Sequence, residues 1–170
     1  MSDAPSSSTE LTPVLKGIRG ELTFTTTSRG PMTAWVTLVD KADLSVAARA
    51  LKMVGARLSV ITAFVRDASG ANPLAYLFDV DGANVTLRVR VAPGDAVETL
   101  VPMFRNADWL ERELMELFDI QVSGRANSPR LFLDESVDAH VMDRLVPLSV
   151  LANAASTEVL FQRIAETGEG

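Results

Sequence analysis

Cysteine is absent from this chain of 170 residues, and His140 is its single histidine. Iron–sulfur clusters and the usual nickel–iron centre are held by thiolates, and protein zinc sites rely mostly on thiolate and imidazole ligands. The chain therefore cannot hold such a centre by itself, and disulfides are excluded. We expect no cofactor, no metal site and no redox centre within it.

Lysine is scarce as well: Lys16, Lys41 and Lys52 are the whole supply, and the net charge is −6. Binding to a phosphate backbone depends on clustered Lys and Arg that release counterions, and the arginines here are scattered along the chain. Nucleic acid and anionic membrane surfaces are therefore not expected as partners.

Long hydrophobic runs are also missing. No apolar stretch approaches the roughly 20 residues that a helix needs to cross a bilayer, so we expect no direct membrane insertion. Residues 1–9 are rich in Ser and lack the basic and apolar regions of a signal peptide. These observations favour a cytoplasmic protein.

What is present is the composition of an ordinary globular domain, with 47% hydrophobic and 22% charged residues. Alternating and helical periodicities predict strands at 21–28, 34–39, 57–65, 74–80 and 85–91, and helices at 44–54, 97–104 and 107–118. Asp81 and Gly82 suit the turn of a hairpin. The predicted fold is α+β, a two-layer domain at 14–134 with a mixed or mostly antiparallel sheet packed against helices.

The two ends of the chain have other patterns. Residues 1–13 are small and polar, which predicts a disordered N-terminal segment. Two further helices are predicted at 137–145 and 154–165, and they form a helical C-terminal extension at 135–170. His140 lies on the first of them, where a surface histidine is the simple interpretation and a proton relay is the alternative.

Outside the helices, arginine and tryptophan side chains are candidate contact residues. The alternation at 85–91 places Arg88 and Arg90 on the outer face of a half-buried strand, where they face either solvent or the carboxylates of a partner. Trp35 and Trp109 are more typical of core or interface anchors than of residues that stack on a ligand.

The helix predicted at 107–118 carries an unusual charged triplet, Glu111-Arg112-Glu113. Arg112 lies one turn from both Asp108 and Glu116, so a solvated face with i,i+4 ion pairs is the simple interpretation. A paired-carboxylate acid–base site is the alternative. It is disfavoured because Glu111 and Glu113 are two residues apart and point to different faces of the helix.

The same helix resembles a known signature. Asp108, Trp109, Glu111, Arg112, Glu113, Phe118, Ile120 and Gly124 match an Asn/Asp-Trp-aromatic-Glu-Arg-Glu helix followed by Phe-Gly-Ile and a glycine turn, and Glu116 keeps the charge of an aspartate in that pattern. The pattern is that of the 30 kDa subunit of respiratory complex I, an NADH dehydrogenase, and of its relatives in energy-converting nickel–iron hydrogenases.

The chain departs from this pattern in two places. Asp119 replaces a glycine at the expected C-terminal end of the helix, where left-handed geometry is needed and Asp is tolerated better than most residues. Residues 125–129 replace most of a His-Pro-Asp-Leu-Arg-Arg loop, of which only Arg130 is kept. These departures favour the hydrogenase branch, such as energy-converting or carbon-monoxide-induced hydrogenases.

The resemblance implies a non-catalytic docking protein, peripheral to the cytoplasmic membrane, that binds the large catalytic subunit and neighbouring iron–sulfur subunits of a hydrogenase or complex I-like assembly. The residues implied in partner binding are Trp109, Glu111, Arg112, Glu113, Glu116 and Arg130. A stand-alone adaptor or assembly factor of the same fold is the alternative. A hydrolase would require a concave pocket with convergent polar groups around Glu113.

Overall fold

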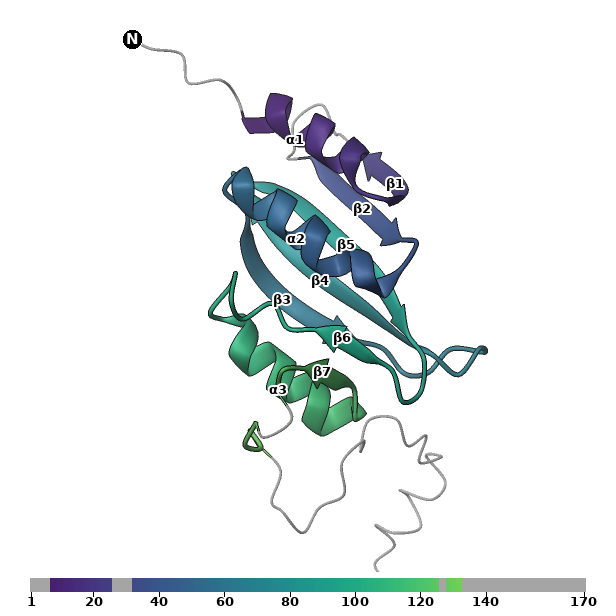
Figure 1. Ribbon diagram of the computed structural model, residues 1–170. Helices are drawn as coiled ribbons and strands as arrows, with labels where there is room; N and C mark the ends of the chain where they lie inside the picture. Colours follow the sequence, from purple (N-terminus) through teal and green to yellow (C-terminus); the bar gives the residue numbers. More distant parts are fainter. Residues whose placement is uncertain (1–6, 26–31, 126–127, 133–170) are drawn as a thin grey trace, which may run out of the picture.

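The computed structural model describes residues 7–25, 32–125 and 128–132, and a five-stranded sheet is its centre (Figure 1). The strand order is β1-β2-β5-β4-β3, and only the β2–β5 pair is parallel. The strands are β1 (Gly20–Thr25), β2 (Thr33–Leu38), β3 (Arg57–Ala63), β4 (Asn72–Val80) and β5 (Ala83–Val91). The sheet is therefore mixed and mostly antiparallel, as the sequence predicts.

Three α-helices and a second, two-stranded sheet complete the described fold. They are α1 (Ser7–Gly17), α2 (Leu44–Met53), which follows the 3-10 turn η1 (Lys41–Asp43), α3 (Ala107–Phe118), and the parallel pair β6 (Ala96–Glu98) and β7 (Gln121–Ser123). Among the described residues, no helix is long and apolar enough to cross a membrane.

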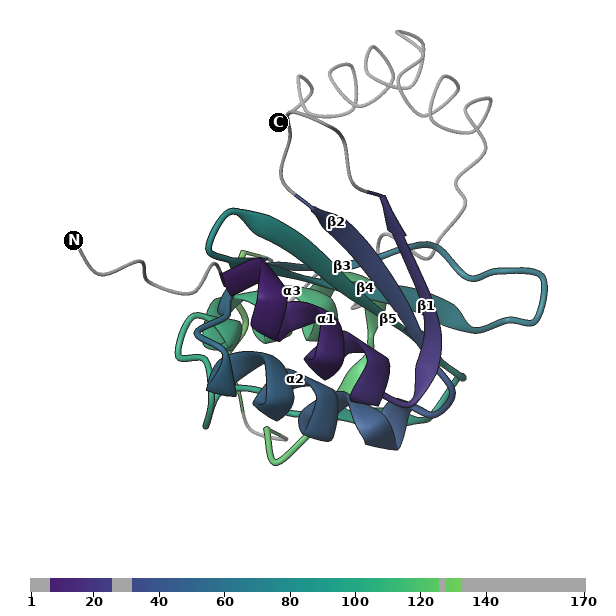
Figure 2. The ribbon, with the colours of Figure 1, turned by 90° about the horizontal axis from the view of Figure 1, so that it is seen from above.

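The helices all pack on the same face of the five-stranded sheet. Phe78 of β4 is paired with Leu58 of β3, so both side chains point to one face. Phe78 meets the Phe104 ring edge-on at 5.4 Å, and Lys52 of α2 lies over that ring. Asn106, at the start of α3, donates to the Leu58 carbonyl. Figure 2 shows α1 and α2 side by side on this side of the sheet, so the predicted two-layer α+β fold is confirmed.

The turn between β4 and β5 consists of two residues whose backbone conformation favours a hairpin. Asp81 and Gly82 both have positive φ, 49° and 83°, which is the geometry of a two-residue turn whose twist matches the flanking strands. The alternating residues of β4 are buried on the helix-covered face, which gives the core Leu74, Tyr76 and Phe78.

The predicted disorder of residues 1–13 is wrong from Ser7 onward, because α1 begins there. Leu11, Leu15 and Ile18 are buried in the core, and their spacing of four and three residues is that of one helical face. The apolar spacing is short and lies among polar residues around Pro13, so it was not recognised as a helix in the sequence.

Two details of the middle of the chain also differ from expectation. The register of β3 shifts between Leu58 and Val60, so Leu58, Ile61 and Ala63 are buried while Val60 is exposed; a bulge of this kind changes the face of every later residue. The helix predicted at 97–104 is absent, since Val97 pairs with Val122 in the small parallel sheet. The helices predicted at 137–145 and 154–165, and His140, lie outside the described residues.

Candidate functional site

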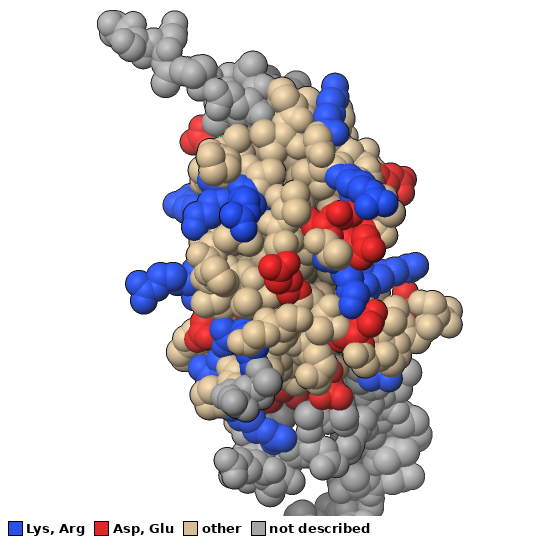
Figure 3. All heavy atoms as spheres, viewed as in Figure 1, with Lys and Arg blue, Asp and Glu red and all other residues tan. Residues whose placement is uncertain are grey.

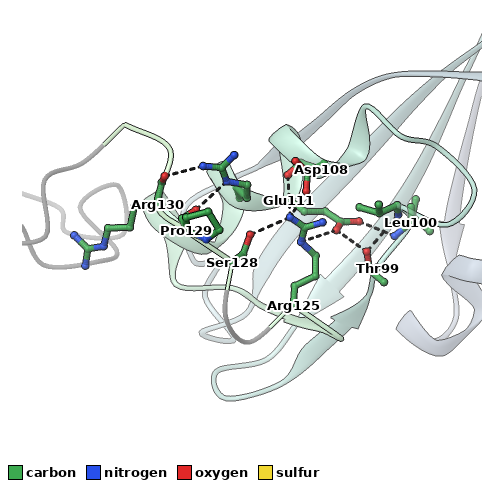
Figure 4. A network of polar contacts seen from close by, with 10 residues as sticks. Thr99, Leu100, Asp108, Glu111, Arg125, Ser128, Pro129 and Arg130 are labelled. Carbon is green, nitrogen blue, oxygen red and sulfur yellow. Dashed lines mark hydrogen bonds and ion pairs between the residues drawn. The ribbon is translucent and has the colours of Figure 1, made fainter.

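Glu111 is the buried centre of the charged helix α3, with a relative exposure of 1%. Its carboxylate accepts hydrogen bonds from the Leu100 backbone N–H at 2.6 Å and from Thr99 Oγ1 at 2.7 Å (Figure 4). Arg125 Nε lies 3.5 Å from the same carboxylate. Glu111 therefore holds the chain between β6 and α3 in place.

The environment of Glu111 affects its protonation. Burial raises the pKa of this carboxyl, and the hydrogen bonds from Leu100 and Thr99 and the nearby Arg125 guanidinium partly offset that effect. Tyr76 of β4 lies beneath the same region, and its burial, with the Glu111 charge as the second cause, raises the pKa of the phenol. Both groups are therefore held in a core-like setting and not at a solvent-filled cleft.

Arg125 connects α3 to the chain that follows β7. Its guanidinium forms an ion pair with Asp108 at the start of α3 and donates to Ser128 Oγ at 3.0 Å. With Glu111 on its other side, this side chain is only 12% exposed. Charge-assisted contacts of this kind fix geometry, so Arg125 sets how residues 128–132 leave the small sheet.

Glu116 is the second buried acid of α3, with a relative exposure of 4%. It accepts hydrogen bonds from the backbone N–H groups of Leu131 at 2.7 Å and Phe132 at 3.0 Å. A carboxylate that accepts two backbone N–H groups fixes the path of that backbone. Residues 131–132 are thereby fastened along α3.

Arg112 fastens the same segment one turn away. It donates from Nε to the Pro129 carbonyl at 2.8 Å and from an Nη to the Arg130 carbonyl at 2.7 Å. The ion pairs expected between Arg112 and Asp108 or Glu116 are wrong, because the backbone carbonyls take the guanidinium and the two acids have other partners. The Arg112 guanidinium also lies 5.9 Å from the Trp109 ring centre, within the range of a cation–π contact.

Two large aromatic side chains beside this network are mostly exposed to solvent. Trp109 on α3 is 61% exposed, and Phe132, whose backbone N–H binds Glu116, is 64% exposed. A shallow hollow of about 140 Å³ lies between α3 and residues 128–130, lined by Arg112, Met115, Glu116, Ser128, Pro129 and Arg130. Glu113 is not among its lining residues, so this hollow does not supply the acid–base site that a hydrolase would need.

A family model described as "Respiratory-chain NADH dehydrogenase, 30 Kd subunit" matches residues 37–151, more than half of the chain. The chain belongs to this 30 kDa subunit family. The resemblance seen in the sequence is thereby confirmed. The matched range includes every residue of the Glu111–Arg125 network and all six residues predicted for partner binding.

Curated relatives match over shorter segments. The J subunit of the NAD(P)H-quinone oxidoreductase of Synechococcus sp. (strain RCC307) is 47% identical over 55 residues, which are 31% of this chain and 31% of that protein. The C subunit of the NADH-quinone oxidoreductase of Rhodopseudomonas palustris (strain TIE-1) is 32% identical over 68 residues, 39% of this chain and 33% of that protein. The matches therefore span about a third of the length of these relatives.

One solved structure shares the fold. A chain in the structure of the membrane-bound sulfane sulfur reductase (MBS), an archaeal respiratory membrane complex, aligns with a TM-score of 0.59 at 18% identity, over 77% of this chain and 79% of that one. At this identity the likeness concerns the fold alone. It agrees with the mixed sheet and one-sided helices of the 30 kDa family member described here.

The signature residues of this 30 kDa family member have different surroundings. Glu111 and Glu116 are buried, Arg112 and Glu113 are half-buried, and Trp109 and Arg130 are exposed. Arg125 and Thr99 belong to the same network but were not among the predicted site residues. One signal in the sequence could have identified Arg125. It is a basic residue directly after Gly124, in the loop that departs from the family pattern, and the acids of the helix, which need a cationic partner, are all kept.

Proposed function

We propose that this chain is a non-catalytic docking protein within a multi-subunit, membrane-associated oxidoreductase. In this proposal α3 and residues 128–132 form the surface that binds the large catalytic subunit, close to neighbouring iron–sulfur subunits. The observation that carries the proposal is membership of the 30 kDa family across residues 37–151. The relatives are named as subunits of quinone oxidoreductases, and a place at the cytoplasmic membrane through such a complex follows.

The hydrogen bonds that the carboxylates of Glu111 and Glu116 accept support a structural role for both residues. Glu111 binds the backbone before α3, and Glu116 binds the backbone after β7. A general acid or base needs a free position for the proton that it transfers, whereas these carboxylates are committed to main-chain donors. They are suited to keeping a surface in a fixed shape.

The exposed apolar residues support the location of the docking surface. Phe132 lies on the segment whose backbone binds Arg112 and Glu116, and Trp109 lies on α3, the helix that carries both of these residues. Aromatic side chains on a preorganised surface are the usual anchors of protein interfaces, because little conformational entropy is lost when they are buried.

The charge distribution on the visible side also favours a protein partner. In Figure 3, Lys and Arg are interspersed with Asp and Glu over the described surface. Nucleic-acid binding requires a cluster of positive charge, so this side is better suited to contacts with another protein.

A hydrogenase-type complex is the finer proposal. Asp119 replaces a family glycine and adopts the left-handed geometry expected there, with φ 53° and ψ 31°. The segment 125–130 lacks most of the loop pattern of the respiratory subunits. These two departures support the branch of energy-converting hydrogenases over the NADH-oxidising complexes.

The test is co-purification of the affinity-tagged full chain from membranes of its source cells. Trp109→Ala is expected to lower the recovered large subunit roughly tenfold, the effect of an anchor worth about 1.4 kcal/mol. Val46→Ala is the matched control, because Val46 is an exposed apolar residue of α2 outside the proposed surface. Charge reversal at Arg112 should act like Trp109→Ala by releasing residues 129–130.

The alternative of a stand-alone adaptor or assembly factor gives a different result. It would be recovered without any large subunit and without iron–sulfur subunits, and this outcome would overturn the proposed function. The neighbouring reading frames provide a second check, since a nickel–iron large subunit with paired cysteine motifs is expected beside this gene.

A further inference from the structure

The two outer strands of the five-stranded sheet differ in how their free edges are protected. β3 has a register shift between Leu58 and Val60, and the Asn106 side chain donates to the Leu58 carbonyl. β1 pairs with β2 in continuous register along its whole length, and its sequence Gly-Glu-Leu-Thr-Phe-Thr contains neither Lys nor Pro. Within the described part of the chain, no strand pairs with the outer side of β1. An edge without a bulge or a basic residue can pair with a further strand.

The backbone of β1 directs alternate residues to its outer side. The N–H of Val39 donates to the Arg19 carbonyl at 3.3 Å, and these two residues continue the pairing of β1 with β2. In an antiparallel ladder, pairs that exchange hydrogen bonds alternate with pairs whose N–H and C=O groups point away from the partner strand. The outward groups therefore belong to the even-numbered residues of β1, which are Gly20, Leu22 and Phe24.

The side chains of the same residues lie on the helix-covered face of the sheet. Phe24 pairs with Ala34 and Leu22 pairs with Val36, and both partners are fully buried on that face. Phe24 is nevertheless 52% exposed, and Gly20 has no side chain with which to cover its own end of the strand. The outer edge therefore combines an exposed aromatic ring at one end with bare backbone at the other.

We propose that a second copy of this chain pairs with β1, so that the two β1 strands run antiparallel about a twofold axis at Leu22. In this register Leu22 lies opposite Leu22 of the other copy, and Phe24 of each copy covers Gly20 of the other. All three pairs bring outward-facing backbone groups of both copies together, so each pair can exchange hydrogen bonds. A twofold contact of this kind is closed, and the product is a dimer.

The opposite face of the paired strands contains the contact that limits affinity. Glu21 lies opposite Thr23 of the other copy, so no like charges are directly opposed. The two Glu21 carboxylates are diagonal neighbours, whose Cα atoms are about 7–8 Å apart in such a pair. Their repulsion weakens the dimer, and removal of this charge should strengthen it.

The contact is small and lies away from the proposed docking surface. Residues 20–24 of each copy bury less than the roughly 1,200 Å² that marks the low end of specific interfaces, so we expect a dissociation constant on the order of 100 µM. β1 and α3 lie at opposite ends of the domain (Figure 1). Pairing through β1 therefore leaves α3 and residues 128–132 accessible.

Amide exchange of the full chain, followed by NMR, tests which residues pair. At a concentration about ten times the dissociation constant, the Leu22 and Phe24 amides should exchange about fivefold more slowly than in dilute solution, because about four fifths of the chains are then paired. The Thr23 amide already points toward β2 and should not change with concentration.

A mixture of isotope-labelled and unlabelled chain tests the register. A nuclear Overhauser effect should appear between the Phe24 ring of one copy and Gly20 of the other. Within one chain these residues are about 13 Å apart along the strand, too far for this effect, so the signal can arise only between molecules.

Sedimentation velocity over a concentration series measures the affinity of variants. Phe24→Lys should weaken association at least tenfold, because it removes the cover of Gly20 and places a lysine on the edge. Phe64→Lys is the matched control, since Phe64 is 53% exposed but follows β3 at the other edge of the sheet; it should not change the affinity. Glu21→Gln should tighten association about twofold to threefold.

Several results would overturn the proposal. They are a chain that remains monomeric at about ten times the expected dissociation constant, equal weakening by Phe64→Lys and Phe24→Lys, and a dimer in which the Leu22 and Phe24 amides gain no protection. The last result would mean that the copies meet through another surface, such as the open sheet face. None of these measurements involves the large subunit, so their outcome is independent of the proposed docking function.

Discussion

Arg125 lies beside Glu111 with its Nε 3.5 Å from a carboxylate oxygen, and the two side chains are only 12% and 2% exposed. Burying two charges costs desolvation free energy that their attraction offsets only when other hydrogen bonds complete the site. Here Leu100 and Thr99 donate to Glu111, and Asp108 and Ser128 bind Arg125. The pair therefore joins three chain segments in one arrangement.

Removal of the Glu111 carboxylate should destabilise the whole domain. Glu111→Ala leaves the buried Leu100 N–H without its acceptor and Arg125 without its partner, so we expect a loss of about 3 kcal/mol in the free energy of unfolding. Urea denaturation followed by circular dichroism measures this change. Glu113→Ala, two residues along the same helix, should cost less than about 0.5 kcal/mol. Similar losses for the two variants would contradict the structural role of Glu111.

The raised pKa of Glu111 predicts a pH dependence of definite sign. Between the unfolded value of about 4.3 and the higher folded value, the native state binds more protons than the unfolded state. The contribution of this group to stability is therefore largest below the unfolded value and decreases as pH rises through the folded value.

Glu111→Gln cannot titrate, so it isolates this contribution. Urea denaturation of wild type and Glu111→Gln at a series of pH values should show the free energy of unfolding of wild type falling relative to the variant as pH rises, then levelling off. A difference that grows in favour of wild type with rising pH would show that the folded pKa is lowered and not raised.

The sequence predicted the five strands of the large sheet, α2 and α3, because those elements depend on local periodicity; β6 and β7 of the small sheet were not predicted. The Asp81-Gly82 turn and the left-handed Asp119 were also predictable, since both rest on the conformational preference of single residues. The prediction of a helix at 97–104 was wrong because Val97 pairs with Val122 in a β-sheet. These two residues are far apart in the sequence, so the pattern of neighbouring residues gives no sign of their contact.

The site was predicted only in part for the same reason. A triplet of charged residues on a helix suggests a solvated face, and nothing local shows that Glu111 is buried under Leu100 or that Glu116 binds Leu131. The family signature identified these residues without their roles. Arg125 was missed because its partners lie on α3, 14 and 17 positions earlier in the chain.

Glu116 should control the order of residues 131–132. Glu116→Ala removes the acceptor of the Leu131 and Phe132 N–H groups, so these two amides should exchange with solvent about tenfold faster or more, as expected for the loss of roughly 1.4 kcal/mol of local protection. Hydrogen exchange followed by NMR measures each amide separately. In Glu113→Ala the two rates should be unchanged; a similar increase there would mean that Glu116 is not the residue that holds this segment.

The close approach of β1 to β2 should make Gly20 intolerant of any side chain. A Cβ at Gly20 would lie 2.5 Å from the Thr37 carbonyl oxygen and 3.0 Å from Val36 Cγ1, and backbone on the paired strand cannot yield without breaking the ladder. Gly20→Ala should therefore cost about 1–3 kcal/mol. Gly17→Ala, at the end of α1, has no atom within 4 Å of the added Cβ and should be neutral or stabilising by up to about 1 kcal/mol. Urea denaturation compares the two, and equal stability of both variants would mean that β1 can move away from β2 at little cost.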